Sequence, residues 1–96
     1  MIRVVRSRKY EETLKRLLVD YKDIKSIRTA IKIFSKKPSD TRLKTHALRK
    51  RLLGKYAFSV DNDIRIIFER LAKNTVRFLA IGKHIDVYGR NKRSVK

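Results

Sequence analysis

Two runs of alternating apolar residues flank a turn at Asp61-Asn62, and this arrangement limits the possible folds more than any other part of the chain. Alternation on both sides of a short turn is typical of a β-hairpin. Successive strand side chains point to opposite faces, so the second run should have one core face and one outer face. The expected core face carries Ile64, Ile66 and Phe68, and the outer face carries Asp63, Arg65 and Ile67. The outer face is then able to carry chemistry.

The other segments predict an α+β domain with the element order β-α-α-β-β-β. A strand is expected over residues 2–6, and helices are expected over about 8–21 and 23–37, where apolar residues recur at helical spacing and Ser7 is a candidate N-cap. Antiparallel strands are expected at about 56–60, 63–71 and 75–81, followed by a short segment over 85–88. Only one or two residues separate the helices. They should therefore form a helical hairpin on one face of an antiparallel or mixed sheet.

Length and composition narrow the class of protein. A chain of 96 residues predicts a single domain, 1–96, with one core. The absence of Cys excludes a disulfide framework, a thiolate zinc site and a cysteine nucleophile, and it favours the cytoplasm. Lys or Arg interrupts every hydrophobic segment, so neither a membrane span nor a signal peptide is expected.

Charge indicates the kind of partner. The chain has 27 Lys and Arg against 9 Asp and Glu, a net charge of +18. Such a surface repels itself unless an anion shares it, and nucleic acid is the first candidate because binding phosphates releases condensed counterions. The simpler alternative is a basic protein whose charge only keeps it in solution.

A basic loop over residues 39–55 and a basic tail over 90–96 concentrate this charge. The loop is expected to include at most a short helical turn, and the tail is expected to be mobile. The cations expected to bind RNA are Arg42, Lys44, Arg49, Lys50, Arg51, Lys55 and Lys83.

Candidate catalytic groups lie near the outer face: His46, Asp63, Arg65 and His84. Cleavage of RNA by its own 2′-hydroxyl needs a base, an acid and a fixed cation, roles that suit histidine and arginine. Each residue also has a purely structural interpretation. The histidines are typical loop residues, Asp63 suits a turn, and Arg65 could pair with Asp61 or Glu69. No ligand pair has the i, i+4 spacing of a strong metal motif, so we expect no metal and no cofactor.

At this point the sequence resembles the RelE/ParE toxin superfamily, and most closely its YafQ-like branch. The resemblance rests on the element order and on two motifs. They are H-x-L-(x)n-L-x-G-x-x-x-F-S-V-x-x-D-x-R-I-I-F from His46 to Phe68 and I-G-x-H-x-x-V-Y from Ile81 to Tyr88. This implies a microbial-RNase-like fold. It also implies the toxin of a type II toxin–antitoxin pair, an endoribonuclease that cuts messenger RNA in the ribosomal A site without a metal ion.

The resemblance also implies roles for individual residues. His46 and His84 would carry protons, Asp63 would orient a histidine or take part in proton transfer, and Tyr88 would stack on or position a base. Arg65 matches an arginine that other branches use to hold phosphate. Ser59 stands where the YafQ branch often has a further histidine. The implied partners are messenger RNA, ribosomal RNA and a cognate antitoxin with an acidic neutralising segment.

Two rival functions remain open. A ParE-like toxin of the same fold would inhibit DNA gyrase without a nuclease site. The histidine pair with Asp63 argues against it, because gyrase-directed relatives generally lack these residues. A non-catalytic RNA- or ribosome-binding module would share the charge but would not need the candidate catalytic groups.

Overall fold

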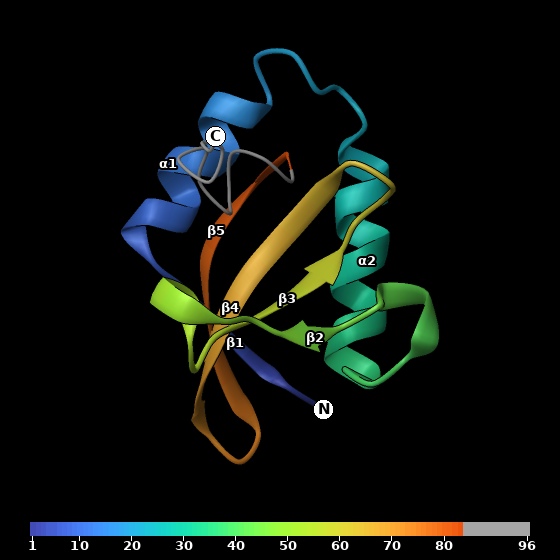
Figure 1. The fold of residues 1–96 in the computed structure, drawn as a ribbon. Coiled ribbons are helices and arrows are strands. Elements are labelled where there is room, and N and C mark those ends of the chain that lie inside the picture. The colour runs from blue at the N-terminus through green and yellow to red at the C-terminus, as the bar shows by residue number, and fades with distance from the viewer. Residues whose placement is uncertain (84–96) are drawn as a thin grey trace.

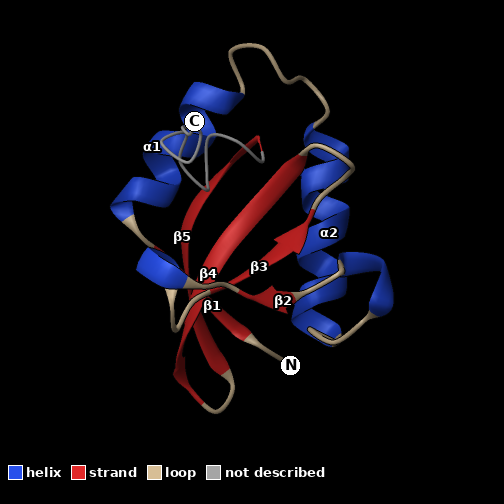
Figure 2. Cartoon of the chain, in the orientation of Figure 1, coloured by secondary structure: helices blue, strands red, loops and turns tan. Residues whose placement is uncertain are grey.

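The described part of the chain forms a five-stranded mixed sheet with two helices on one face (Figures 1 and 2). The computed structural model describes residues 1–83. Its strands are β1 (Arg3–Arg6), β2 (His46–Ala47), β3 (Tyr56–Ser59), β4 (Ile64–Ala72) and β5 (Thr75–Lys83). Its helices are α1 (Arg8–Leu17) and α2 (Ile24–Lys36), with short 3₁₀ helices η1 (Thr41–Leu43) and η2 (Lys50–Leu52). The sheet order is β1-β5-β4-β3-β2, in which only β1 and β5 run parallel.

This architecture confirms the predicted α+β fold and adds one strand to it. The loop expected over residues 39–55 contains the two-residue strand β2, which pairs with β3 between two 3₁₀ helices. Two residues are too few to show a strand period, and β2 forms because the edge of β3 is available for pairing.

The helices begin at side-chain caps and are shorter than the apolar pattern predicts. The Oγ of Ser7 accepts the N–H of Tyr10, which confirms Ser7 as the cap of α1. The Asp23 carboxylate likewise accepts the N–H of Ser26 at the start of α2. Helix α1 ends at Leu17 and not near residue 21, because the chain then makes a turn over residues 18–20. Residues 18–23, and not one or two residues, connect the helices.

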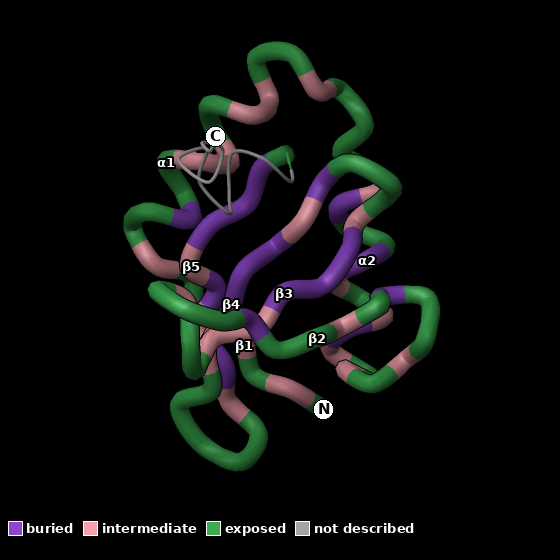
Figure 3. Tube along the Cα trace, in the orientation of Figure 1, coloured by how far each residue is buried: buried purple, intermediate pink, exposed green. Residues whose placement is uncertain are grey.

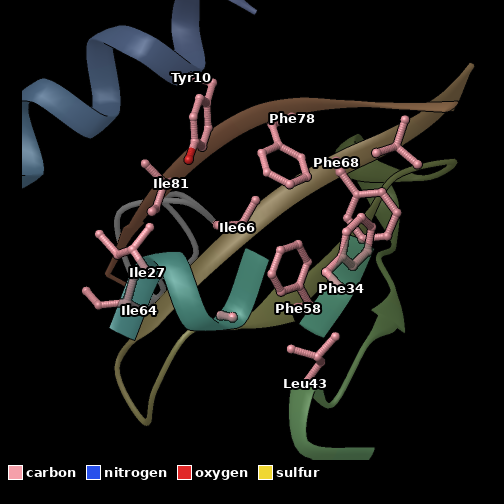
Figure 4. Packing of buried hydrophobic residues seen from close by; sticks show 12 residues of the cluster. Tyr10, Ile27, Phe34, Leu43, Phe58, Ile64, Ile66, Phe68, Phe78 and Ile81 are labelled. Atoms are coloured by element: carbon pink, nitrogen blue, oxygen red, sulfur yellow. The ribbon is translucent and has the colours of Figure 1, made fainter. Parts of the chain in front are cut away.

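Both helices bury their apolar residues on the same face of the sheet. Helix α1 packs along β5 and α2 lies beside β3, so the arms of the predicted hairpin spread over different strands (Figure 1). At the centre, the Phe34 ring of α2 stacks on Phe58 with centroids 4.5 Å apart and meets the edge of Phe68 at 4.8 Å (Figure 4). The middle of β3, β4 and β5 is consequently buried (Figure 3).

A bulge in β5 lets that strand serve both faces. Ile67 pairs with Ala80 but Phe68 pairs with Phe78, so Leu79 is an extra residue. Phe78 and Ile81 therefore join the same core, although strict alternation would place them on opposite faces. Leu79 packs on the face away from the helices.

Tyr10 is a polar exception inside the core. It is fully buried, and its hydroxyl has no hydrogen-bond partner among residues 1–83. Burial raises the pKa of Tyr10 to about 12.

Tyr10→Phe removes an unsatisfied donor while keeping the ring against Phe78. We therefore expect the free energy of unfolding to rise by up to about 1–2 kcal/mol. Urea unfolding of the wild type and of Tyr10→Phe measures the difference. If the variant's free energy of unfolding is lower by more than about 1 kcal/mol, the hydroxyl has a hydrogen-bond partner.

Candidate active site

The sheet face away from the helices is built from rows of side chains on β3, β4 and β5. The first row holds Ser59, Arg65 and Gly82, which are direct cross-strand partners. Cross-strand partners share a face, and Gly82 brings no side chain to this row. The burial pattern supports the predicted division of β4, because Ile64, Ile66 and Phe68 are buried in the helix-side core while Arg65 is half-exposed.

This outer face is only partly open to solvent, although a sheet with both helices on one face was expected to leave the other face free. Leu48, Ala57 and Ile67 form a second apolar cluster, against which Leu52 and Leu79 pack. The segment around η2 therefore covers the middle of the face and buries Ile67. The free energy gained by burying Leu48 and Leu52 outweighs the electrostatic repulsion among the three cations between them, Arg49, Lys50 and Arg51.

Arg65 is anchored by one nitrogen, which leaves its other edge available. Its Nη1 donates to the backbone oxygens of Asp61 at 2.9 Å and Ile64 at 3.3 Å. The Nε and Nη2 groups make no further hydrogen bond or ion pair in the described part of the chain. Together they present the two parallel N–H donors that match two phosphate oxygens. The fixed guanidinium can therefore hold a phosphate without losing its anchor.

Asp61 organises the turn that leads into β4. Its Oδ1 accepts the N–H groups of Asp63 and Ile64, both at 2.8 Å, and its Oδ2 accepts the Tyr21 hydroxyl at 2.8 Å. Burial alone would raise the pKa of Asp61, but these hydrogen bonds outweigh it and lower the pKa. Burial raises the pKa of Tyr21 to about 12, and the hydrogen bond to Asp61 adds to the effect. The sequence placed Asp61 in the turn, where Asp is common, but did not assign it this hydrogen-bonding role.

Asp63 lies in this turn and not at the start of the strand as predicted. Strand β4 begins at Ile64, and Asp63 is exposed. Its backbone N–H donates to the Asp61 carboxylate, and it stands two residues before Arg65 in the chain.

We expect Asp61→Ala to destabilise the protein by about 1–2 kcal/mol at pH 7, because two N–H donors and a hydroxyl lose their acceptor. Asp61→Asn still offers one side-chain oxygen to accept the two backbone N–H groups, so it should cost only a few tenths of a kcal/mol. The folded pKa is lower than the unfolded one, so the carboxylate's contribution is complete above about pH 4 and is lost as pH falls through the folded pKa. Urea unfolding at pH 7 and pH 3 tests this; a gap between wild type and Asp61→Ala that widens in acid would contradict it.

His46 lies on the edge strand β2, opposite Ala57 and therefore on the outer face. Its Nδ1 lies 3.0 Å from the backbone oxygen of Lys44. A carbonyl oxygen only accepts, so Nδ1 carries the hydrogen and the neutral ring keeps a lone pair on Nε2. The exposed ring can therefore accept a proton at a defined atom.

The register also sets the spacing between His46 and Arg65. They are separated by two strand spacings across the sheet and two residues along it. Strand spacings of ~4.8 Å and a rise of ~3.4 Å per residue put their Cα atoms about 12 Å apart. Both side chains can contact the same extended RNA strand, but they do not contact each other.

The seven predicted RNA-binding cations are not equivalent. Arg42 is held by Asp40 through Nε at 3.0 Å and Nη2 at 2.9 Å, and these bonds lower the pKa of Asp40 to about 2. Lys55 lies 3.8 Å from Glu69, which also pairs with Arg77. Lys83 is opposite Ile64, so it lies toward the helix side and not beside Arg65. Lys44 and Arg49 flank β2, whereas Lys50 and Arg51 lie within η2, and all four are exposed.

Two predicted catalytic residues, His84 and Tyr88, lie outside the described residues, as does the basic tail over 90–96. Among residues 1–83, no group of three or more His, Cys, Asp or Glu side chains gathers in a way that could hold a metal ion. Within the same range, no helix is long and apolar enough to cross a membrane.

The fold and this face together define a small basic α+β domain. No protein-family model and no curated protein sequence matches the chain. Solved structures do. YafQ from E. coli strain BL21(DE3) superposes with a TM-score of 0.78 at 19% identity, over 93% of this chain and 100% of YafQ. YafQ in the E. coli DinJ-YafQ complex gives a TM-score of 0.76 at 20% identity, over 93% and 100% of the two chains.

A third similar structure is a metal-bound toxin from Helicobacter pylori, with a TM-score of 0.73 at 20% identity over 91% of this chain and 99% of the toxin. These similarities confirm the expected YafQ-like fold. At this level of identity they establish the fold, and the chemistry must be argued from this chain's own residues.

Proposed function

We propose that the protein is the toxin of a type II toxin–antitoxin pair and acts as a ribosome-dependent endoribonuclease that cleaves messenger RNA in the ribosomal A site. The YafQ fold supports the toxin class, since similar structures include the E. coli DinJ-YafQ toxin-antitoxin complex. The observation that carries the nuclease assignment is the anchored Arg65 on a sheet face that also presents His46.

The proposed reaction is general acid–base cleavage. The 2′-oxygen of RNA attacks the adjacent phosphorus as a base takes its proton, and an acid protonates the departing 5′-oxygen. His46 is one proton carrier, because its Nε2 is free in the tautomer that Lys44 selects. The family resemblance assigns the second proton to His84 and the contact with a base to Tyr88. Asp63 orients a histidine or takes part in proton transfer, and Arg65 stabilises charge on the phosphate oxygens.

The spacing of the site supports dependence on the ribosome. His46 and Arg65 are far enough apart that only a correctly placed RNA strand meets both. Holding a substrate in one geometry can contribute many orders of magnitude to a rate. The exposed cations near β2 and η2 would bind ribosomal RNA.

The net charge of +18 also supports a partner with opposite charge. In this proposal a cognate antitoxin covers the cationic face with an acidic segment, and the cell is poisoned only when the antitoxin is lost.

The test is induced expression in cells without the antitoxin, followed by single-turnover cleavage on ribosomes programmed with a defined message. We expect protein synthesis to fall before DNA synthesis, and cuts to map to the A-site codon. If DNA synthesis falls first, with gyrase-linked strand breaks, the protein is a ParE-like gyrase inhibitor. Ribosome binding without cleavage would identify a non-catalytic module, and efficient cleavage of naked RNA would contradict dependence on the ribosome.

A further inference from the structure

A pocket on the helix side of the edge strand β2 shares only His46 with the groups proposed to cleave RNA. It has a volume of about 660 Å³ and lies between the loop after α2, the edge strand β2 and the far part of β4. Residues that line it include Asp40, Lys44, Thr45, His46, Tyr56 and Arg70. Its size is within the usual range for small-ligand sites.

The pocket has an aromatic wall that is held in place. The Tyr56 ring stacks on Phe68, with centroids 5.6 Å apart and planes inclined by 23°. The Arg70 guanidinium lies over the Tyr56 ring, 5.5 Å from its centroid. Tyr56 is half-buried and Arg70 is exposed. A fixed ring with a planar cation is a surface on which a nucleobase can stack.

The charge of the pocket favours an anionic ligand. Lys44 and Arg70 supply positive charge. The single acid of the lining, Asp40, is already neutralised by its two-pronged bond to Arg42. The loop is also fixed from within, because the Thr45 hydroxyl donates to the backbone oxygen of Pro38 at 2.9 Å.

His46 connects the pocket to the outer face. It lines the pocket, and its pairing with Ala57 places it on the face that carries Arg65. Strand β2 is only two residues long and forms the edge of the sheet, so little chain separates the two sites. A single RNA strand that crosses the outer face at His46 can turn over this edge.

We propose that this pocket binds one unstacked base of the RNA strand, close to the cleaved phosphate, with the base stacked on the exposed guanidinium plane of Arg70, which the Tyr56 ring supports from beneath. This inference rests on the proposed function for the identity of the strand, whereas base binding itself can be measured without ribosomes. It makes the pocket a determinant of sequence preference, with His46 as the one residue that it shares with the groups proposed to cleave. Single-stranded RNA is recognised in this way, by splayed bases on aromatic and arginine planes.

The experiment is an NMR titration of the whole protein with adenosine 5′-monophosphate, and with ribose 5-phosphate as the probe that lacks a base. We expect the nucleotide to shift the amide signals of Lys44, His46, Tyr56 and Arg70. We also expect it to bind roughly tenfold more tightly than ribose 5-phosphate. Arg70→Ala should lose this advantage, whereas Arg28→Ala, an equal charge change on the exposed side of α2, should keep it.

Equal binding of the two probes would overturn the proposal, because charge alone would then explain it. The proposal also fails if an acidic tryptophan-containing peptide shifts these signals and the nucleotide does not, since the pocket would then be a protein-docking site. Tyr56→Phe, which keeps the ring, should bind the nucleotide as wild type does, and a large loss would also count against stacking. If the protein binds the nucleotide but does not cleave the message on programmed ribosomes, the base-binding proposal holds and the proposed nuclease activity fails. If it cleaves the message in the A site but binds no nucleotide, the nuclease proposal holds and the base-binding proposal fails.

Discussion

Replacing Arg65 with alanine is expected to lower single-turnover cleavage on programmed ribosomes by a hundredfold or more, with ribosome binding nearly unchanged. Its Nε and Nη2 groups face no other partner in residues 1–83 and can hold two phosphate oxygens as charge develops. Removing one fixed donor from such a site typically costs a factor of about 10² to 10³ in rate. Arg65→Lys should recover only part of the loss, because lysine has no planar pair of donors.

The control for Arg65 is folding, since the same side chain ties the turn at Asp61 to β4. Thermal unfolding of Arg65→Ala should show a folded protein, and Arg28→Ala should cleave at the wild-type rate. Wild-type cleavage by a folded Arg65→Ala protein would remove the phosphate role from this residue. A loss of ribosome binding equal to the loss of cleavage would show that Arg65 acts in docking and not in the reaction.

The second large effect is expected at Phe34, where truncation to alanine should destabilise the protein by about 3–5 kcal/mol. The ring is fully buried and contacts three others, with centroids 4.5 Å from Phe58, 4.8 Å from Phe68 and 5.8 Å from Phe78. A domain of this size has a total stability of roughly 5–14 kcal/mol. The melting temperature should therefore fall by more than about 10 °C.

Calorimetry or circular dichroism measures this, with Phe34→Leu as the matched variant. Leucine refills most of the space and should cost much less than alanine. A drop of less than about 1 kcal/mol for Phe34→Ala would mean that the core is not centred on this ring.

The alternation over residues 56–68 was sufficient to predict the sides of β4, because a strand period of two leaves few other arrangements. The sequence therefore sufficed to place Arg65 on the other face of the sheet from Ile64 and Ile66. Strand β2 could not be predicted, since it exists only through its pairing with β3. The ends of the helices were also misplaced, because apolar spacing continues past Leu17 while the backbone turns to bring Tyr21 to Asp61.

Less of the candidate site was predictable than of the fold. The chemical types of His46, Asp63 and Arg65 were visible in the sequence, but their spacing depends on sheet register. The leucines that cover the outer face, Leu48 and Leu52, stand among cations, and their burial follows from a tertiary contact with Ile67. The roles proposed for His84 and Tyr88 stay predictions, since both lie outside the described residues.

The parallel pairing of β1 with β5 limits when the sheet can form during synthesis. Arg3 lies opposite Thr75 and Arg6 opposite Phe78, so β1, the first strand to be synthesised, cannot pair until β5 has been synthesised. Ribosomes release chains from the N-terminus onward, and such distant pairings form late. The row of Ser59, Arg65 and Gly82 is likewise complete only when β5 has docked. A nascent chain that stalls before residue 75 lacks the strand that pairs with both β1 and β4, so neither the closed core nor the row around Arg65 can form while β5 is still being made.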